Sequence, residues 1–159
     1  MSDDGGMIRV FLLDDHEVVR RGIAAALEAE SDLKVVGEAG TADEAMAGIR
    51  DQTPDVAVLD VRLGDGEHNG IDVCREITAE FPDVKVLILT SFDSDRALVD
   101  AGLAGASGFI LKQIRSNELV DAIRGIAEGR RFLDDAEVRL AGRRLRDSEE
   151  GRLDDLTAQ

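Results

Sequence analysis

Three aspartates follow apolar runs of this 159-residue chain at positions where strands would end. Asp14 and Asp15 come directly after the run "IRVFLL", and Asp60 closes the run "DVAVLD". If these runs are neighbouring parallel strands, the carboxylates converge, and each close pair repels by about 4 kcal/mol at an effective dielectric constant of roughly 20. A divalent cation would relieve that repulsion, and all-oxygen ligation favours Mg²⁺ or Mn²⁺ over zinc. The alternative is that Asp14 and Asp15 only cap the following helix, in whose first turn we place His16.

A hydroxyl group and an ammonium group stand at the ends of two later apolar runs. Thr90 and Ser91 end the run "VKVLILTS", and Lys112 ends "GFILK". A phosphoryl group on Asp60 would carry a charge of roughly −1.5 to −2. Lys112 would neutralise that charge, and Thr90 would donate a hydrogen bond. Taken singly, Thr90 could satisfy its own backbone and Lys112 could be a solvated surface lysine; together with the aspartates they predict a phosphoryl site.

Apolar runs and helical patterns alternate over residues 8–129. The β-branched residues and the near-continuous apolarity of the runs indicate parallel strands covered on both faces. Thr41 with Glu44 three residues later predicts one helix start, and a candidate N-cap at Ser116 and a stop at Gly129 bound another helix. We predict an α/β fold: a doubly wound, five-stranded parallel sheet of flavodoxin-like order 2-1-3-4-5 with helices on both faces, plus a C-terminal linker helix. The predicted strands cover residues 8–13, 33–39, 55–60, 84–90 and 108–112.

That strand order places a ligand crevice between the first and third strands, where the order reverses. The glycine-rich stretch "GDGEHNG" after Asp60 would let backbone carbonyls approach a metal there without side-chain obstruction. Elsewhere, the helix over 116–129 offers more apolar surface than one core face needs, so a homodimer face there is a hypothesis. Its apolar residues are Leu119, Val120, Ile123 and Ile126.

Composition limits the kinds of protein that this chain can be. Hydrophobic residues make up 43% and charged residues 33%, as in globular proteins. No apolar run approaches the roughly 20 residues that a membrane-spanning helix needs. The single cysteine, Cys74, excludes an intramolecular disulfide and is consistent with the reducing cytoplasm. The net charge of −15 argues against the chain gripping nucleic acid through its own surface.

Four stretches together resemble the receiver domain of two-component response regulators: "FLLDDHEVVRRGI", "DVAVLDVRL", "VLILTS" and "GFILK". The resemblance covers about residues 7–129, and the ordered set is far more specific than any one stretch. It implies that Asp60 is the phosphoacceptor of a sensor histidine kinase and that phosphorylation promotes a homodimer. The implied Mg²⁺ ligands are Asp14, Asp15, Asp60 and the backbone carbonyl of Arg62. The implied phosphate-binding and switch residues are Thr90, Lys112, Phe109 and Ser91.

Two features differ from the usual pattern of that family. Gly64 stands where the family usually has proline, and the helix-opening glycine, Gly70, comes two residues later than usual. We therefore expect a longer and looser loop, which could alter metal affinity and phosphoryl lifetime. Phe109 lacks the phenolic hydroxyl that many relatives carry, so its ring donates no hydrogen bond to a partner. Plain core packing is the alternative role for this ring.

The stretches "DDHEVVRRGI" and "LDDLTAQ" resemble the LuxR/NarL-type subgroup, and within it the actinobacterial dormancy-type regulators. In that subgroup a Leu-Thr pair, here Leu156-Thr157, opens a helix-turn-helix domain. We therefore expect a fragment of a cytoplasmic transcriptional regulator that contacts DNA only through a C-terminal domain outside this chain. The expected parts are a flexible N-terminus (1–6), a receiver domain (7–129) and a linker (130–159).

Three other functions remain as alternatives. One is a stand-alone receiver that acts through protein–protein contacts. A haloacid-dehalogenase-like phosphohydrolase also uses Asp, Thr, Lys and Mg²⁺, but it places its nucleophile on the first strand and a second acid two residues later, where this chain has His16 after Asp14. An interaction module with a decayed site would not explain why every site position is occupied. We expect no enzyme with a separate substrate, only phosphotransfer to its own aspartate and autodephosphorylation.

Overall fold

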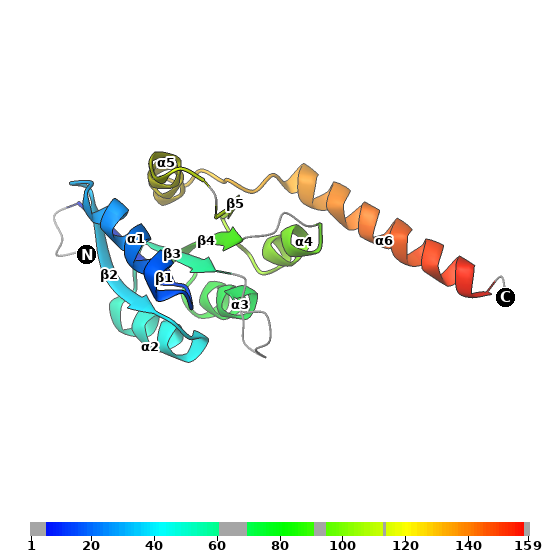
Figure 1. Cartoon of the computed structure of the whole chain (residues 1–159), viewed down its shortest axis with the longest axis horizontal. Coiled ribbons are helices and arrows are strands. Elements are labelled where there is room, and N and C mark those ends of the chain that lie inside the picture. Colours follow the sequence, from blue (N-terminus) through cyan, green and yellow to red (C-terminus); the bar gives the residue numbers. More distant parts are fainter. Residues whose placement is uncertain (1–5, 61–69, 91–94, 113, 158–159) are drawn as a thin grey trace.

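The computed structural model describes residues 6–60, 70–90, 95–112 and 114–157, with side chains described as far as residue 148. Its centre is one sheet of five parallel strands in the order β2-β1-β3-β4-β5 (Figure 1), which confirms the predicted topology. The strands are β1 (Ile8–Leu13), β2 (Leu33–Ala39), β3 (Val56–Asp60), β4 (Lys85–Thr90) and β5 (Gly108–Leu111). The helices are α1 (Glu17–Glu28), α2 (Ala42–Gln52), α3 (Gly70–Glu80), α4 (Asp95–Leu103), α5 (Ser116–Ala127) and α6 (Asp135–Thr157).

The central strands are buried on both faces because their side chains alternate between two hydrophobic cores. In β1, Phe11 and Leu13 enter the core beneath α2, α3 and α4, whereas Val10 and Leu12 enter the core beneath α1 and α5. All of β3 is buried, as expected for a parallel strand with helices on both sides. This double burial holds the carboxyl ends of β1 and β3 rigidly at one edge of the sheet.

The observed boundaries differ little from the predicted ones. β1 and β2 have the predicted limits, and the other three strands differ by one residue at one end. At the start of α2, Thr41 Oγ1 accepts a hydrogen bond from Glu44 N at 3.2 Å, but the Glu44 carboxylate accepts from Gly40 N instead of Thr41 N. The predicted N-cap at Ser116 is wrong by one position. The extended backbone of Arg115 takes the N-cap place, so Ser116 is already the first residue of α5.

The apolar side chains of α5 face the sheet. α5 ends as predicted, with Gly129 in left-handed backbone at a φ of +99°. The four residues of the suggested homodimer face are 4% exposed or less and belong to the core shared with α1. These four side chains are therefore not free to form a homodimer face, because the fold already buries them, and a dimer contact elsewhere on α5 stays a prediction. The residues concerned are Leu119, Val120, Ile123 and Ile126.

After α5 the chain returns to the sheet before α6 begins. Phe132 N donates to Ser107 O at 2.8 Å and Phe109 N donates to Phe132 O at 3.2 Å, so this stretch lies beside β5 like a short extra strand. Leu133 then enters the core at 5% exposure. α6 packs against α4 at its beginning and continues away from the body of the protein (Figure 1).

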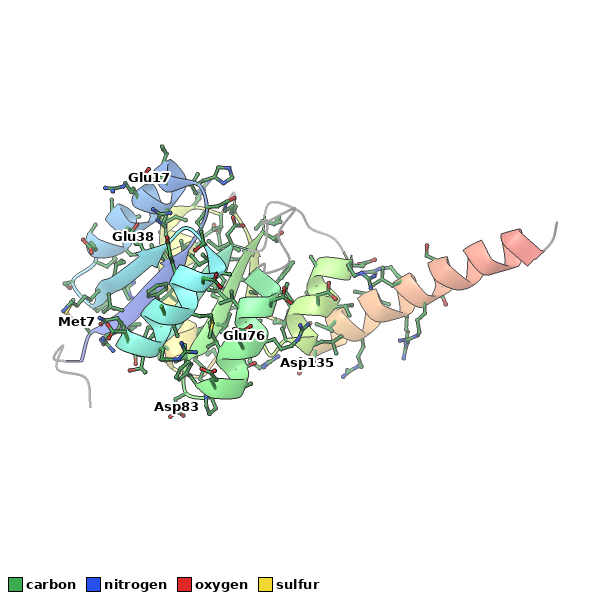
Figure 2. All side chains as sticks on the ribbon, turned by 90° about the horizontal axis from the view of Figure 1, so that it is seen from below. Met7, Glu17, Glu38, Glu76, Asp83 and Asp135 are labelled. Carbon is green, nitrogen blue, oxygen red and sulfur yellow. The ribbon has the colours of Figure 1, made fainter. Side chains whose placement is uncertain are left out.

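Acidic side chains lie on several faces of the body. Glu17, Glu38, Glu76 and Asp83 are exposed on α1, β2, α3 and the turn before β4 (Figure 2). The net charge of −15 is therefore distributed over the surface and is not confined to the strand ends. None of the helices in the described ranges combines the length and apolarity needed to cross a membrane.

Phe11 lies against two glycines that leave its ring no spare room. A Cβ on Gly37 of β2 or on Gly48 of α2 would lie 2.5 Å from Phe11 Cε2. Gly48→Ala should lower the free energy of unfolding, because overpacking costs about 1–3 kcal/mol and helix propensity returns no more than about 1 kcal/mol. Gly22→Ala is the control, because a Cβ at this position of α1 would meet nothing within 4 Å. This variant should raise the free energy of unfolding. Urea unfolding measures both variants, and a stabilised Gly48→Ala would contradict this packing.

Candidate functional site

The carboxyl ends of β1, β3 and β5 bring one lysine between two aspartates. Lys112 Nζ lies 2.8 Å from Asp14 Oδ2 and 3.1 Å from Asp60 Oδ2. Asp60 is the last residue of β3, and Asp14 and Lys112 directly follow β1 and β5. Backbone hydrogen bonds extend the sheet by one residue at each of these two strand ends. Asp14 N donates to Ala39 O, and Lys112 N donates to Thr90 O. The sheet itself therefore positions the three charged side chains.

Both aspartates are buried, at 3% exposure for Asp14 and 1% for Asp60. Buried carboxylates this close require positive charge beside them, because desolvation and mutual repulsion both disfavour the ionised forms. Burial alone would lower the pKa of Lys112, but its interactions with both aspartates outweigh burial, so the pKa is raised above its ordinary value. One ammonium still leaves the two carboxylates with a net negative charge. Despite the close ion pair, Asp14 Oδ2 has no well-aligned hydrogen bond among the described residues.

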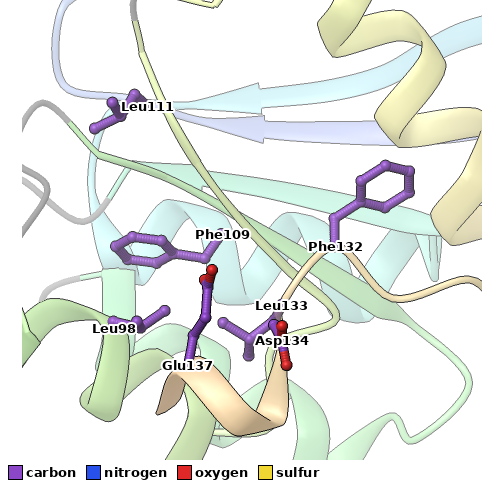
Figure 3. A pocket seen from close by; sticks show the side chains of 7 residues that line it. All are labelled: Leu98, Phe109, Leu111, Phe132, Leu133, Asp134 and Glu137. Atoms are coloured by element: carbon purple, nitrogen blue, oxygen red, sulfur yellow. The ribbon is translucent and has the colours of Figure 1, made fainter. Parts of the chain in front are cut away.

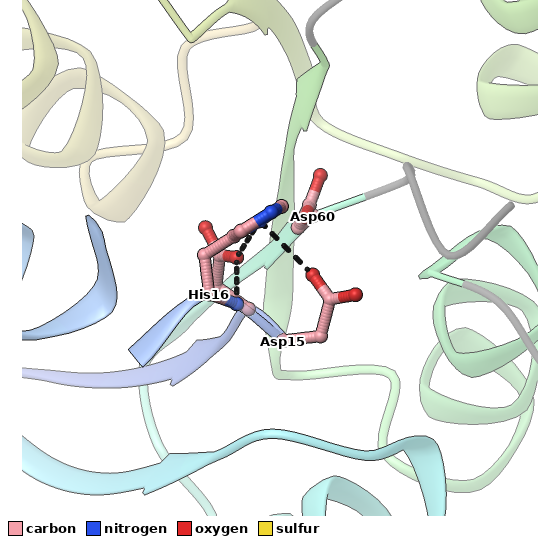
Figure 4. A group of neighbouring side chains, drawn as sticks. Asp15, His16 and Asp60 are labelled. Atoms are coloured by element: carbon pink, nitrogen blue, oxygen red, sulfur yellow. Dashed lines mark hydrogen bonds and ion pairs between the residues drawn. The ribbon is translucent and has the colours of Figure 1, made fainter. Parts of the chain in front are cut away.

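A third aspartate and a histidine complete an acidic cluster at this edge (Figure 4). Ligand atoms of all four residues lie within 4.8 Å of one another. His16 Nδ1 is 3.2 Å from Asp15 Oδ1 and 3.5 Å from Asp14 Oδ1. The members of this acidic cluster are Asp14, Asp15, His16 and Asp60.

His16 occupies the N-cap position of α1, so its predicted place in the first helical turn is wrong. The His16 side chain makes no capping hydrogen bond to α1. Asp14 Oδ1 instead accepts a hydrogen bond from His16 N at 2.9 Å, which folds the turn back onto the acidic cluster. The alternative in which Asp14 and Asp15 serve only as helix caps is therefore not supported. His16 is a site residue that was not predicted from the sequence, although its place directly after two acids was a usable indication.

The acidic cluster has the donor atoms that a hard divalent cation needs. Carboxylate oxygens are the ligands that Mg²⁺ and Mn²⁺ prefer. Asp14 Oδ2 is a buried oxygen that has the Lys112 ion pair but no aligned hydrogen bond within the described ranges. The side chains of Asp15 and His16 are 40% and 46% exposed, so the cluster opens to solvent on one side. The predicted backbone ligand, the carbonyl of Arg62, lies outside the described residues, as does Ser91.

Thr90 and Phe109 lie on the neighbouring strands β4 and β5. Thr90 ends β4, is 3% exposed and pairs in register with Leu111, which places it next to Lys112. Phe109 pairs with Ile88 and packs against the core that α2, α3 and α4 cover. Its ring therefore lies on the α4 side of the sheet.

The structure thus gathers most of the predicted site at one sheet edge. A buried carboxylate, an ammonium group, a hydroxyl-bearing residue and a cluster suited to a divalent cation can together accept and neutralise a phosphoryl group. The residues at this edge are Asp14, Asp15, Asp60, Thr90 and Lys112, while Phe109 lies further along β5.

Comparison with known proteins agrees with this geometry. The family model for the response regulator receiver domain matches residues 10–124. DevR/DosR of Mycobacterium tuberculosis, a DNA-binding transcriptional activator, is 55% identical over 128 residues, which cover 80% of this chain and 58% of DevR/DosR. The transcriptional regulatory protein LiaR of Bacillus subtilis is 39% identical over 150 residues, which cover 92% of this chain and 69% of LiaR. The chain therefore spans only part of the length of these relatives.

A solved structure gives the same result at the level of the fold. The crystal structure of a LuxR-family two-component response regulator from Aurantimonas superposes with a TM-score of 0.76 at 34% identity, over 87% of this chain and 99% of that one. These matches do not favour the haloacid-dehalogenase-like alternative. The chain belongs to the response regulator receiver domain family, and its relatives are of the LuxR/NarL type.

Proposed function

We propose that this chain is a phosphorylation switch in which Asp60 accepts a phosphoryl group from a sensor histidine kinase. The observation that carries the proposal is the placement of Asp60. It is a buried carboxylate at a strand end, 3.1 Å from Lys112 Nζ and within the acidic cluster. Membership of the receiver domain family supports the same assignment.

The residues at the sheet edge have separate parts in the transfer. One Asp60 oxygen forms a bond to phosphorus while the bond between phosphorus and the donor nitrogen of the kinase histidine breaks. Lys112 is already paired with Asp60, so it can neutralise the phosphoryl oxygens without a large movement. Thr90 would donate a hydrogen bond to the same oxygens. We assign Ser91 to this phosphate-binding group as well.

The reaction is proposed to depend on Mg²⁺ or Mn²⁺. When bound, the cation supplies positive charge that screens the carboxylates from the incoming phosphoryl group. Hydrolysis of the phosphoaspartate by water is the other reaction that we assign, so the protein turns over no separate substrate. The proposed ligands are Asp14, Asp15, Asp60 and the backbone carbonyl of Arg62.

Thr90 and Phe109 are the proposed switch pair, because they lie on adjacent strands between the phosphoacceptor and α4. Moving an equilibrium from 1:99 to 99:1 requires about 5.5 kcal/mol. Hydrogen bonds to charged groups contribute about 1.5–3 kcal/mol each. A new bond from Thr90, together with the move of the existing Lys112 ion pair onto the phosphoryl oxygens, therefore supplies part of the energy that such a shift needs.

The proposed output is control of transcription in the cytoplasm. DevR/DosR is a DNA-binding transcriptional activator. This chain has a net charge of −15, so we assign DNA binding to a helix-turn-helix domain outside it and propose that phosphorylation promotes a homodimer. In this proposal residues 1–6 are a flexible N-terminus, residues 7–129 the receiver domain and residues 130–159 the linker to that domain.

Incubation with Mg²⁺ and acetyl phosphate tests the phosphoacceptor. We expect the intact mass of the chain to increase by one phosphoryl group, because the small donor can replace the kinase histidine. Asp60→Asn should abolish the increase, whereas Asp83→Asn, an exposed carboxylate before β4, should leave it unchanged. An increase that persists in Asp60→Asn would place the phosphoryl group elsewhere and contradict the proposal.

Mg²⁺ should stabilise the folded protein through the acidic cluster. A ligand at a hundred times its Kd adds about 2.7 kcal/mol to the free energy of unfolding, so thermal unfolding should move to higher temperature. Asp14→Asn should largely remove this shift. Glu76→Gln, at an exposed carboxylate of α3, is the control and should keep it. Equal Mg²⁺ shifts in both variants would show that the cation binds elsewhere.

Lys112→Met removes the ammonium between Asp14 and Asp60. In Mg²⁺-free buffer near neutral pH we expect the free energy of unfolding to fall by about 3 kcal/mol, since a buried pair that loses one partner leaves uncompensated charge. The pKa of Lys112 is raised in the folded protein. The contribution of Lys112 to the free energy of unfolding is therefore complete below the unfolded pKa of about 10.4, and it is lost as the pH rises through the folded pKa. Denaturant unfolding measures the free energy of unfolding, with Lys34→Met, at an exposed lysine of β2, as the control. Equal losses of free energy in the two variants would contradict the prediction.

A further inference from the structure

Arg20, in the first turn of α1, joins the ends of β1 and β2 beside the acidic cluster. Its Nη1 donates a hydrogen bond to the backbone carbonyl of Asp14 at 2.7 Å, and its Nε donates to Glu38 Oε1 at 3.2 Å. The Arg20 side chain is only 16% exposed. Asp14 N also donates to the carbonyl of Ala39, the last residue of β2. The turn after β1 is therefore tied to β2 by backbone and to α1 by the arginine.

The carbonyl that Arg20 binds belongs to the peptide group between two of the proposed Mg²⁺ ligands, Asp14 and Asp15. A peptide group is planar, so fixing the direction of its oxygen also fixes the directions in which the chain enters and leaves it. The Asp14 side chain is held separately, because its Oδ1 accepts a hydrogen bond from His16 N. This peptide lies in the turn between β1 and α1. The bond from Arg20 thus determines how both carboxylates approach the cluster.

The contribution of Arg20 is one of geometry more than of charge. Glu38 balances the guanidinium charge, and an ion pair with side chains 16% and 35% exposed is only modestly strong. A guanidinium group, however, holds its donors in a rigid planar fork, whereas lysine has a compact ammonium on a flexible stem. Arginine can therefore hold a carbonyl and a carboxylate in one fixed arrangement.

Gly40, at the junction of β2 and α2, leaves the room that this guanidinium occupies. A Cβ at Gly40 would lie 3.3 Å from Arg20 Nη1 and 3.9 Å from the Asp14 carbonyl oxygen. The shorter distance is tighter than ordinary van der Waals contact, so a methyl group there would push the guanidinium away from its carbonyl. The packing around Arg20 is thus specific to its bound position.

Arg20 acts at the end of the sheet opposite the proposed switch ring. β2 and β1 form one end of the strand order, and β5 with Phe109 forms the other. Phe109 lines a cavity of about 190 Å³ at the junction of β5, α4 and α6, together with Leu98, Leu133 and Glu137 (Figure 3). A substitution at Arg20 therefore leaves this region untouched and changes the surroundings of the cation ligands.

We propose that Arg20 is a positioning residue for the divalent cation, because it holds the peptide between Asp14 and Asp15 in the orientation that ligation needs. The inference rests on the proposed function, in which these two aspartates are Mg²⁺ ligands. Groups that orient metal ligands typically change the metal affinity by 10–100-fold when they are removed. Without Arg20, binding of the cation must also order the turn.

Calorimetric titration of the whole chain with Mg²⁺, in constant excess monovalent salt, tests this role. Arg20→Met should raise the Kd for Mg²⁺ by about ten-fold or more. Arg20→Lys should do the same, because it keeps the charge but loses the fork. Arg21→Met, at the neighbouring arginine whose side chain is 73% exposed and pairs with Glu17, is the matched control and should keep the parent Kd. A parent Kd in either Arg20 variant would overturn the proposal.

Two further variants separate positioning from a general loss of stability. Ile126→Val removes a buried methylene from α5 and lowers stability without contact with the turn. This variant should keep the parent Kd, whereas Gly40→Ala, which keeps Arg20 but crowds it, should raise the Kd. If Ile126→Val weakens Mg²⁺ binding as much as Arg20→Met does, the effect is general loosening and the proposal is overturned.

Phosphorylation by acetyl phosphate distinguishes failure of this proposal from failure of the proposed function. The Mg²⁺ concentration that gives half-maximal phosphorylation should rise in Arg20→Met by the same factor as the Kd. A parent chain that binds Mg²⁺ but gains no phosphoryl group would overturn the proposed phosphoacceptor alone, and the Kd values would still decide the role of Arg20. A parent chain that binds no Mg²⁺ would overturn the proposed cation site and the role of Arg20 together.

Discussion

The structure at the sheet edge depends on one electrostatic constraint: two buried carboxylates share a single ammonium. Lys112 Nζ lies within 3.1 Å of both Asp14 and Asp60, and neither carboxylate has appreciable access to water. Such an arrangement survives only if rigid elements hold all three groups, because a flexible chain would separate the like charges. The doubly buried strands β1 and β3 provide that rigidity. The charge that remains unbalanced is what makes the edge receptive to a cation, and the lysine is what makes it receptive to a phosphoryl group.

Much of this edge could be predicted from the sequence, because parallel strands end on the same side of a sheet. Once the order 2-1-3-4-5 is assumed, Asp14, Asp60 and Lys112 must lie together, and the structure confirms the order. His16 was not assigned to the site, since local pattern places it after two acids but does not show that the turn folds back over them. The roles of Arg62 and Ser91 stay predictions, because both residues lie outside the described ranges.

The helices show where sequence patterns reach their limit. An apolar stripe indicates that a face is buried but does not identify what covers it. The stripe of α5 suggested a surface for a second copy, yet it packs on the sheet of its own chain. Conversely, the predicted C-terminal linker helix, which corresponds to α6, gave no indication that it packs against α4. The pair between Arg144 and Asp95 joins residues 49 positions apart, and only the three-dimensional fold brings them together.

The most direct test of the charge balance at this edge is an NMR titration of the chain with small amounts of paramagnetic Mn²⁺. The structure predicts that amide signals near Asp14, Asp15 and Asp60 broaden first, because their carboxylates lie within 4.8 Å of one another and share too little positive charge. Excess Mg²⁺ should restore those signals. Broadening spread evenly over the acidic surface, or centred on the exposed carboxylates of α2 and α3, would contradict the account, because the cation would then have no preference for this edge.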